Sequence, residues 1–310
     1  MIKIIKILLG IGLCLVLYRQ LKSDGTIFQD AVSTIQFPVA LVFCLLLMPF
    51  NLWLEALKWK ILVRPLHEMT MWQSLVNILS GVFMGVFTPA RVGEYGGRMI
   101  NLPPDARIPS IAATLYGSIV QNSIHVLAGF GLSYYFIKSL IRETSENMLL
   151  LHIMSVGILL GLVIITLIPA YWQILFQKLT RYKFTKWIVR FDFLRQITTK
   201  TALSIIFLAS LRYTVYFSQY MLILFALGIH IPFWQQSTGI SLIYLIQSGL
   251  PLPPLLNILG RGEISVVVWQ NFNVAVQLAL SATFILWFIN IVIPALVGYF
   301  MVLKYKSPSS

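Results

Sequence analysis

The sequence predicts an all-α, polytopic integral membrane protein with about six spanning helices and two re-entrant helical hairpins in an inverted-repeat arrangement. The first of three observations behind this prediction is composition. Of the 310 residues, 58% are hydrophobic and only 11% are charged, against about 25% charged residues in soluble domains. Second, several apolar segments are long enough to span a membrane. Third, a short motif of proline, glycine, arginine and glutamate interrupts two apolar stretches.

The net charge of +13 is spread between the apolar segments and is not gathered in one basic domain. Such charges are typical of topology signals and of contacts to anionic lipid headgroups, so we expect no nucleic-acid partner. Cys14 and Cys44 each stand alone in an apolar segment, which disfavours a disulfide framework or a zinc site, and we expect no cofactor. The length leaves room for one membrane domain, residues 1–303, and a short cytoplasmic tail, residues 304–310.

Six segments reach or approach the roughly 20 apolar residues that a spanning helix needs. These segments are 2–18, 37–57, 110–137, 148–176, 202–227 and 282–303. The first resembles a signal peptide in its charge and apolarity. No small-residue cleavage motif follows it, so we expect a retained helix.

Two further apolar stretches, 74–102 and 237–280, are interrupted by the repeated motif. Its first copy occupies residues 88–94 and its second residues 251–263. Interrupted segments at matching places in two halves of a chain are typical of a transport site. We therefore predict that each stretch is a hairpin that enters the membrane partway and returns. The alternative is that both are ordinary spans with kinks at the prolines, which would give eight spans.

Basic residues predict the orientation of the chain. The loop 178–200 carries seven lysines and arginines against one aspartate, so it should be cytoplasmic. Counting crossings outward from this loop puts both termini in the cytoplasm of a multi-pass protein of the cell (inner) membrane. The two hairpins would then enter the membrane from opposite faces. The loop is also amphipathic, which predicts contact with anionic lipids at the membrane surface, although a plain positive-inside loop has the same charges.

The first copy of the motif places Arg91, Glu94 and Arg98 close together. If a helix begins near Val92, Glu94 lies in its first turn, where the helix dipole favours an anion, and Arg98 lies one turn later. Free backbone N–H groups at such a helix start can bind a phosphate together with the arginines. The alternative is a self-contained Glu94–Arg98 ion pair that stabilises the hairpin.

The second copy repeats the pattern with Arg261 and Glu263, and we expect Glu263 to begin the helix that follows. In the span 110–137, helical spacing gathers a polar face made of Thr114, Ser118, Gln121, Asn122 and His125. This face should look into protein or into a cavity. It serves either hydrogen bonds between helices or substrate contact.

Arg212 lies near the middle of the span 202–227 and needs a carboxylate or an anionic ligand there. The acids within reach of the membrane are Glu55, Glu94 and Glu263, and we expect at least one of them to pair with Arg212. For Glu55, which precedes Lys58 and Trp59 near the end of its span, we expect interfacial anchoring.

Signals for an enzyme are scarce. The sequence has no G-x-S-x-G, no H-E-x-x-H and no P-loop, and its four histidines lack the spacing of metal ligands. We therefore predict a protein that is not an enzyme and that has no metal site.

Several motif positions together carry a resemblance to a known family. They are Asn51, Leu54, Lys58, Trp59 and Leu62, then residues 87–94, and finally Leu250, Pro251, Gly260, Gly262 and Glu263. This pattern resembles the transmembrane, flippase-like domain of the lysylphosphatidylglycerol synthase family. The resemblance implies movement of lipids between leaflets.

The chain differs from that family in two respects. These 310 residues contain no match to the soluble aminoacyl-transfer domain, so we expect that lipid synthesis does not carry over. Many members also have a Glu-Arg pair followed by an Asp one turn later, where this chain has Gln121, Asn122 and His125. A shared substrate therefore does not follow from the resemblance.

The leading functional hypothesis is a translocator of a lipid or a lipid-linked anionic substrate. The rival is a non-transporting membrane scaffold, or a partner of a separate lipid- or glycan-modifying enzyme. A homo-oligomer is compatible with the translocator and with the rival. The candidate substrate site combines Arg91, Arg98, Arg212 and Arg261 with Glu94, Glu263, Gln121, Asn122 and His125. Its positive excess predicts that the phosphate of a phospholipid or of a polyprenyl-phosphate-linked substrate lies between the two hairpins.

Overall fold

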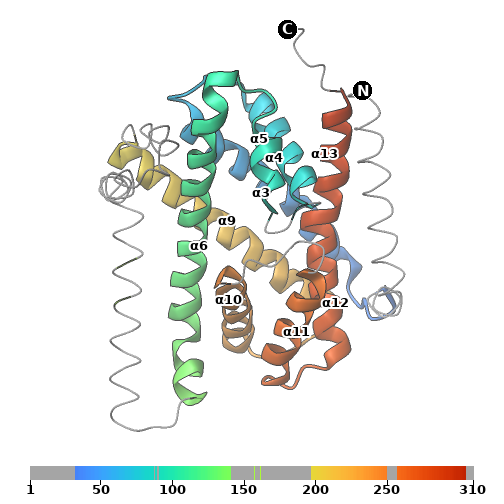
Figure 1. The fold of residues 1–310 in the computed structure, drawn as a ribbon. Helices are drawn as coiled ribbons and strands as arrows, with labels where there is room; N and C mark the ends of the chain where they lie inside the picture. The colour runs from blue at the N-terminus through green and yellow to red at the C-terminus, as the bar shows by residue number, and fades with distance from the viewer. Residues whose placement is uncertain are drawn as a thin grey trace.

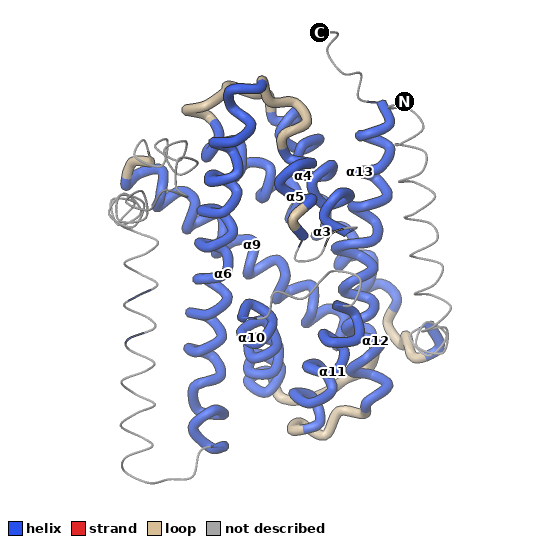
Figure 2. The backbone as a smooth tube through the Cα atoms, viewed as in Figure 1, coloured by secondary structure: helices blue, strands red, loops and turns tan. Residues whose placement is uncertain are grey.

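The computed structural model describes residues 32–86, 88, 91–140, 157, 161, 197–249 and 257–304. Within these ranges every regular element is a helix and no strand occurs, which confirms the predicted all-helical class (Figures 1 and 2). The helices pack into one bundle around the middle of the long helix α9 (Figure 1).

Three helical stretches in the described ranges are long and apolar enough to cross a membrane. They are α3 (Pro38–Val63), α9 (Thr199–Ala226), and the continuous stretch Val276–Leu303, which joins α12 (Val276–Trp287), the π-helical turn η4 (Phe288–Val292) and α13 (Ile293–Lys304). They correspond to the predicted spans 37–57, 202–227 and 282–303.

The predicted span 110–137 lies inside α6 (Pro104–Leu140). At about 1.5 Å per residue, its 37 residues are long enough to cross a bilayer. Its polar face makes it less apolar than the three stretches above, so it is not counted with them. The predicted span 2–18 lies outside the described residues. So does 148–176, apart from Gly157 and Gly161, which are helical.

The first interrupted stretch folds as two helices, α4 (Met71–Val86) and α5 (Gly93–Arg98), that run antiparallel. Asn101 of the returning chain donates a 2.7 Å hydrogen bond to Asn77, in the first half of α4. A Cβ atom at Gly97 would clash with the Ser80 carbonyl, so glycine is required for the two backbones to touch. The chain therefore reverses between residues 86 and 93, where the proline break was predicted.

The second interrupted stretch contains α10 (Phe233–Gly249) and α11 (Asn257–Gln270), and residues 250–256 between them lie outside the described ranges. α10 runs antiparallel to α6, since Ser133 near the end of α6 donates to the carbonyl of Thr238 near the start of α10. α11 runs antiparallel to α10, because the Trp269 ring lies against Gly239. The pairs α4–α5 and α10–α11 therefore begin and end at opposite ends of α6 (Figure 1).

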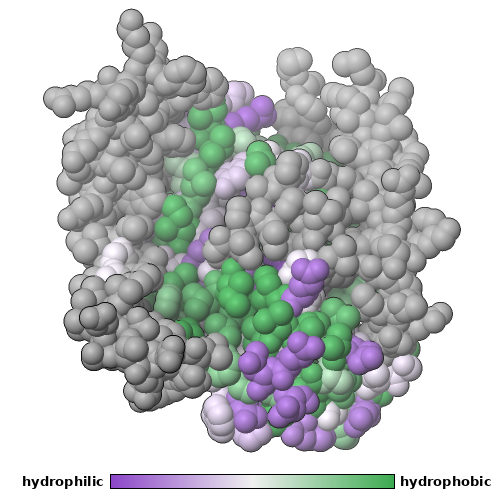
Figure 3. Space-filling model, turned by 60° about the horizontal axis from the view of Figure 1, so that its bottom comes forward, coloured by the Kyte–Doolittle hydropathy of each residue, from purple (hydrophilic) through white to green (hydrophobic). Residues whose placement is uncertain are grey.

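The end where α10 begins and α11 ends carries exposed polar side chains. In Figure 3 this end comes forward and shows polar side chains beside apolar surface. Exposed polar residues here are Gln270, Asn271, Asn273 and Gln277. Among the described residues, the two largest apolar cores lie around Trp59 and Tyr116 and around Tyr220 and Trp269.

Candidate functional site

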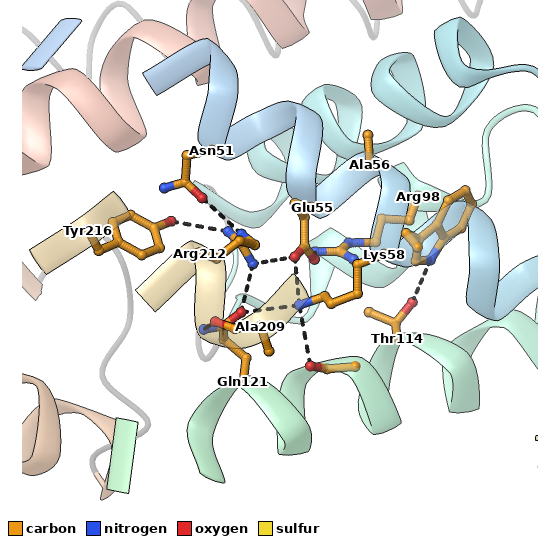
Figure 4. Close-up of polar contacts among 12 residues, drawn as sticks. Asn51, Glu55, Ala56, Lys58, Arg98, Thr114, Gln121, Ala209, Arg212 and Tyr216 are labelled. Atoms are coloured by element: carbon orange, nitrogen blue, oxygen red, sulfur yellow. Dashed lines mark hydrogen bonds and ion pairs between the residues drawn. The ribbon is translucent and has the colours of Figure 1, made fainter. Parts of the chain in front are cut away.

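Glu55, on α3, is the centre of a buried ion-pair cluster (Figure 4). Its side chain is only 8% exposed and lies beside three cations. Lys58 Nζ is 2.7 Å from Oε2, Arg98 is 2.8 Å from Oε1, and Arg212 forms a third ion pair at Oε2. One carboxylate thus joins α3 to α5 and to α9.

Arg212 also forms hydrogen bonds with residues other than Glu55. Its Nε donates to Asn51 Oδ1 at 2.8 Å, and its two terminal nitrogens donate to Gln121 Oε1 and to the Tyr216 hydroxyl, each at 3.2 Å. The expectation that a glutamate pairs with Arg212 is confirmed, and the partner is Glu55. Four donor contacts fix the guanidinium plane, which is the geometry that makes arginine suited to buried ion pairs.

The interfacial role expected for Glu55 is wrong, because Glu55, Lys58 and Trp59 are all buried. Reasoning from the sequence judged Glu55 by its place near the end of the span. A usable signal was present in the spacing of Asn51, Glu55 and Lys58, which are four and three residues apart. That spacing puts one amide and two opposite charges on a single helix face.

The Glu94–Arg98 ion pair on α5, which the sequence allowed as the alternative to a phosphate site, is present. Glu94 lies in the first turn of α5, as predicted, and also pairs with Arg91 at 3.0 Å. Arg98 contacts both Glu94 and Glu55, so it connects the hairpin pair to the central cluster. A Cβ at Gly81 would be 2.8 Å from Arg98 Cγ, so the Arg98 stem occupies space that only glycine on α4 leaves open.

Arg91 is in the left-handed region of backbone conformation, with φ of 57°. This conformation is costly for a residue with a Cβ, and such residues are frequent at ligand sites. Arg91 is also the most exposed member of the cluster, at 37% of its side chain. Its guanidinium therefore pairs with Glu94 while part of the side chain remains exposed.

The second copy of the motif lies in a different environment from the first. The expectation that Glu263 begins a helix is wrong, because α11 begins at Asn257 and both Gly260 and Gly262 are helical. Glu263 is exposed and lies outside the ion-pair cluster. Arg261 is partly buried and within electrostatic range of Arg91, Tyr216 and Tyr244.

The polar face of α6 divides into separate parts. Gln121 is buried in the cluster, where its Oε1 accepts from Arg212 at 3.2 Å and from Lys58 at 3.4 Å. His125 lies next to Gln121 and stacks on Tyr244, with ring centroids 5.5 Å apart. Thr114 accepts a hydrogen bond from Trp59, which is the alternative role that the sequence allowed. Asn122, a predicted site residue, is exposed and lies outside the cluster.

The structure thus brings together Arg91, Glu94, Arg98, Gln121 and Arg212, with His125 adjacent and Arg261 within electrostatic range. Sequence reasoning missed Asn51, Glu55 and Lys58 as members. Within the described ranges, no three His, Cys, Asp or Glu side chains gather as metal ligands. The loop 178–200, for which lipid contact is predicted, lies outside the described residues up to position 196.

The chain was compared with known proteins and families. The family model for the lysylphosphatidylglycerol synthase TM region matches residues 3–298. No curated protein and no solved structure matches the chain significantly.

Proposed function

We propose that this chain, which belongs to the lysylphosphatidylglycerol synthase transmembrane-region family, moves an anionic lipid or a lipid-linked anionic substrate between membrane leaflets. The family and the apolar helices identify a membrane protein with a part in lipid handling. The observation that carries the proposal further is the buried cluster around Glu55, which four helices build and in which cations outnumber carboxylates.

Charge is the reason to connect this cluster with a substrate. Ionised groups in the interior of a membrane protein are costly, and they are typical of substrate pathways. A cluster built only for stability could reach neutrality with one carboxylate for each cation. An anionic headgroup would instead complete the charge balance of this site, with arginine guanidinium groups binding its phosphate oxygens.

The helix pairs supply a route from either face. We propose that α4–α5 enters the membrane from the cytoplasmic face and α10–α11 from the outer face, in a protein with about six spans and both termini in the cytoplasm. The antiparallel packing of each pair and their placement at opposite ends of α6 support this topology. Tags in 138–147 and 228–236 should then be accessible from outside, and tags in 178–200 or after 304 from the cytoplasm. A cytoplasmic reading at 138–147 would contradict the topology.

The proposal gives the protein no enzymatic step of its own. Anionic lipids would also contact the basic loop 178–200. A homo-oligomer is compatible with lipid movement and with the rival function. The rival function, a non-transporting scaffold or a partner of a lipid- or glycan-modifying enzyme, differs in one measurable respect. A scaffold leaves labelled lipid in its original leaflet.

Reconstitution into liposomes tests the function. Purified protein should speed the movement of a labelled anionic phospholipid between leaflets, measured by the access of a membrane-impermeant quencher. Arg212→Gln should reduce both movement and anionic-lipid binding, because Arg212 lies in the buried cluster. Lys183→Gln, in the basic loop, is the charge-matched control and should reduce binding less. A wild-type protein that leaves the label in place, or a larger loss with the loop variant, would contradict the proposal.

A further inference from the structure

The charges of the cluster do not balance within the described part of the chain. Two carboxylates, Glu55 and Glu94, are shared among four cations, which leaves a surplus of two positive charges. The cations are Lys58, Arg91, Arg98 and Arg212. Arg261, within electrostatic range of Arg91, adds positive potential from the second helix pair. Buried charges without compensation are unstable in a low-dielectric interior, so an anion that reaches the buried cations and the partly exposed Arg91 would offset this surplus.

Gln121 occupies the place where a third carboxylate would reduce this surplus. Its Oε1 accepts hydrogen bonds from Lys58 Nζ and Arg212, the same two cations that pair with Glu55 Oε2 (Figure 4). Glutamate has the same length and shape as glutamine. A glutamate at position 121 would therefore place a full negative charge against both cations.

The orientation of the Gln121 amide is fixed by its other contacts. Nε2 donates to the Ala209 carbonyl at 3.1 Å and lies 3.5 Å from a ring nitrogen of His125. Because Nε2 faces a carbonyl, Oε1 is directed at the two cations. Gln121 thus supplies the hydrogen-bond acceptor of a carboxylate without its charge.

Donors for further oxygen atoms are present in the cluster. Arg98 is 5% exposed, and among the described residues its Nε has no hydrogen-bond partner. The Arg91 guanidinium is more exposed than the rest of the cluster and pairs through Nε with Glu94. Both arginines lie on the first hairpin, on either side of Glu94. An oxyanion held there would face two guanidinium groups.

Building on the proposed function, we propose that the site prefers a headgroup that ends in a phosphate monoester, and that Gln121 sets this preference. A phosphate monoester carries about −1.5 to −2 charges at pH 7, which matches the surplus of two. A phosphodiester carries only one negative charge. The neutral side chain at position 121 thus favours a doubly charged headgroup, and a glutamate there would weaken that preference.

Competition between two lipids with the same acyl chains tests the preference. Protein in nanodiscs would be offered phosphatidic acid, a monoester, and phosphatidylglycerol, a diester, and the bound ratio measured by native mass spectrometry. Wild-type protein should favour the monoester. Gln121→Glu should reduce that ratio about thirtyfold, which corresponds to about 2 kcal/mol, the interaction of one added charge at roughly 8 Å at an effective dielectric constant near 20.

Two further variants keep the test decisive. Arg91→Gln also lowers the positive charge by one, at a more exposed position, so it should shift the ratio in the same direction even if Gln121→Glu fails to fold. Gln270→Glu makes the same chemical change at the exposed end of α11 and should leave the ratio unchanged. An unchanged ratio in folded Gln121→Glu or in Arg91→Gln, or an equal shift in Gln270→Glu, would overturn the assignment.

Soluble competitors identify the source of the phosphate. Inorganic phosphate and glycerol phosphate should displace the monoester lipid weakly, because neither has acyl chains to bury. Displacement by inorganic phosphate at lipid-like affinity would overturn the lipid assignment. If wild-type protein binds neither lipid, the proposed function fails. If it binds both equally, only the monoester preference fails.

Discussion

The two interrupted stretches both contain a motif of proline, glycine, arginine and glutamate, but the glutamates of the two motifs lie in different environments. In the first pair, Glu94 is bonded to two arginines and Arg98 reaches the buried Glu55. In the second, Glu263 is exposed on α11. The buried side of this pair packs through aromatic and hydroxyl groups. Tyr220, for example, contacts Ser265 and accepts a hydrogen bond from Trp269. A repeated motif therefore does not imply a repeated site.

The physical difference lies in the neighbouring helices. α4–α5 packs near α3, which supplies Glu55 as the ion-pair partner of Arg98. α10–α11 packs against α6 and α12, where its contacts include Gly129 on α6 and the Ala279 carbonyl on α12. A charged side chain in the interior needs an opposite charge, so the acid of the first pair is held among buried cations, whereas Glu263, the acid of the second pair, is exposed.

The largest effect should come from Glu55→Gln, which breaks the centre of the cluster. Removing one partner of a buried ion pair costs about 3–5 kcal/mol, because the cations remain buried without a counter-charge. Three cations depend on Glu55, so thermal unfolding in detergent should show a large loss of stability. Glu263→Gln, the exposed control, should stay within about 0.5 kcal/mol of wild type. Equal effects of the two variants would contradict the contrast between the helix pairs.

Glu94→Gln should have a smaller effect on stability than Glu55→Gln. It weakens the pairs with Arg91 and Arg98, while Arg98 keeps its contact with Glu55. Hydrogen bonds to charged groups contribute about 1.5–3 kcal/mol, which is the expected loss in chemical unfolding. Transport should fall in parallel, since both arginines would be repositioned. Unchanged stability together with lost transport would instead assign Glu94 directly to the substrate site.

Two neighbouring glycines test the close packing of the first hairpin. A Cβ at Gly97 would clash with the Ser80 carbonyl, whereas a Cβ at Gly96 meets nothing within 4 Å. Gly97→Ala should therefore destabilise the protein by about 1–3 kcal/mol. Gly96→Ala should be neutral, or stabilising by up to about 1 kcal/mol, because alanine is the better helix former. Melting temperatures of the two variants compare them directly, and similar shifts would contradict the packing described.

The smallest effect concerns the second pair. Tyr220→Phe removes a buried hydroxyl that contacts Ser265 and accepts from Trp269, so both partners lose a bond. The expected loss is about 1–2 kcal/mol. Binding of anionic lipid should not change, since no charge of the cluster is altered. A loss of lipid binding at unchanged stability would place part of the headgroup site in the second helix pair.

The sequence alone determined the helical class, the membrane setting and the position of the first chain break. These follow from local properties: apolar length, the scarcity of charge, and proline and glycine at the reversal between residues 86 and 93. The Glu94–Arg98 pair was equally predictable, because four residues separate its members on one helix.

Only the tertiary structure decided which acid neutralises which cation. Glu55 and Arg212 are 157 residues apart, and the packing of α3 against α9 brings them together. Gln121 gained its role in the same way, since its carbonyl oxygen meets cations from two other helices. Glu263 shows the converse, because its surroundings leave it exposed although its motif matches that of Glu94. Local sequence sets where a charge can stand on a helix, and the neighbouring helices decide whether that charge is buried.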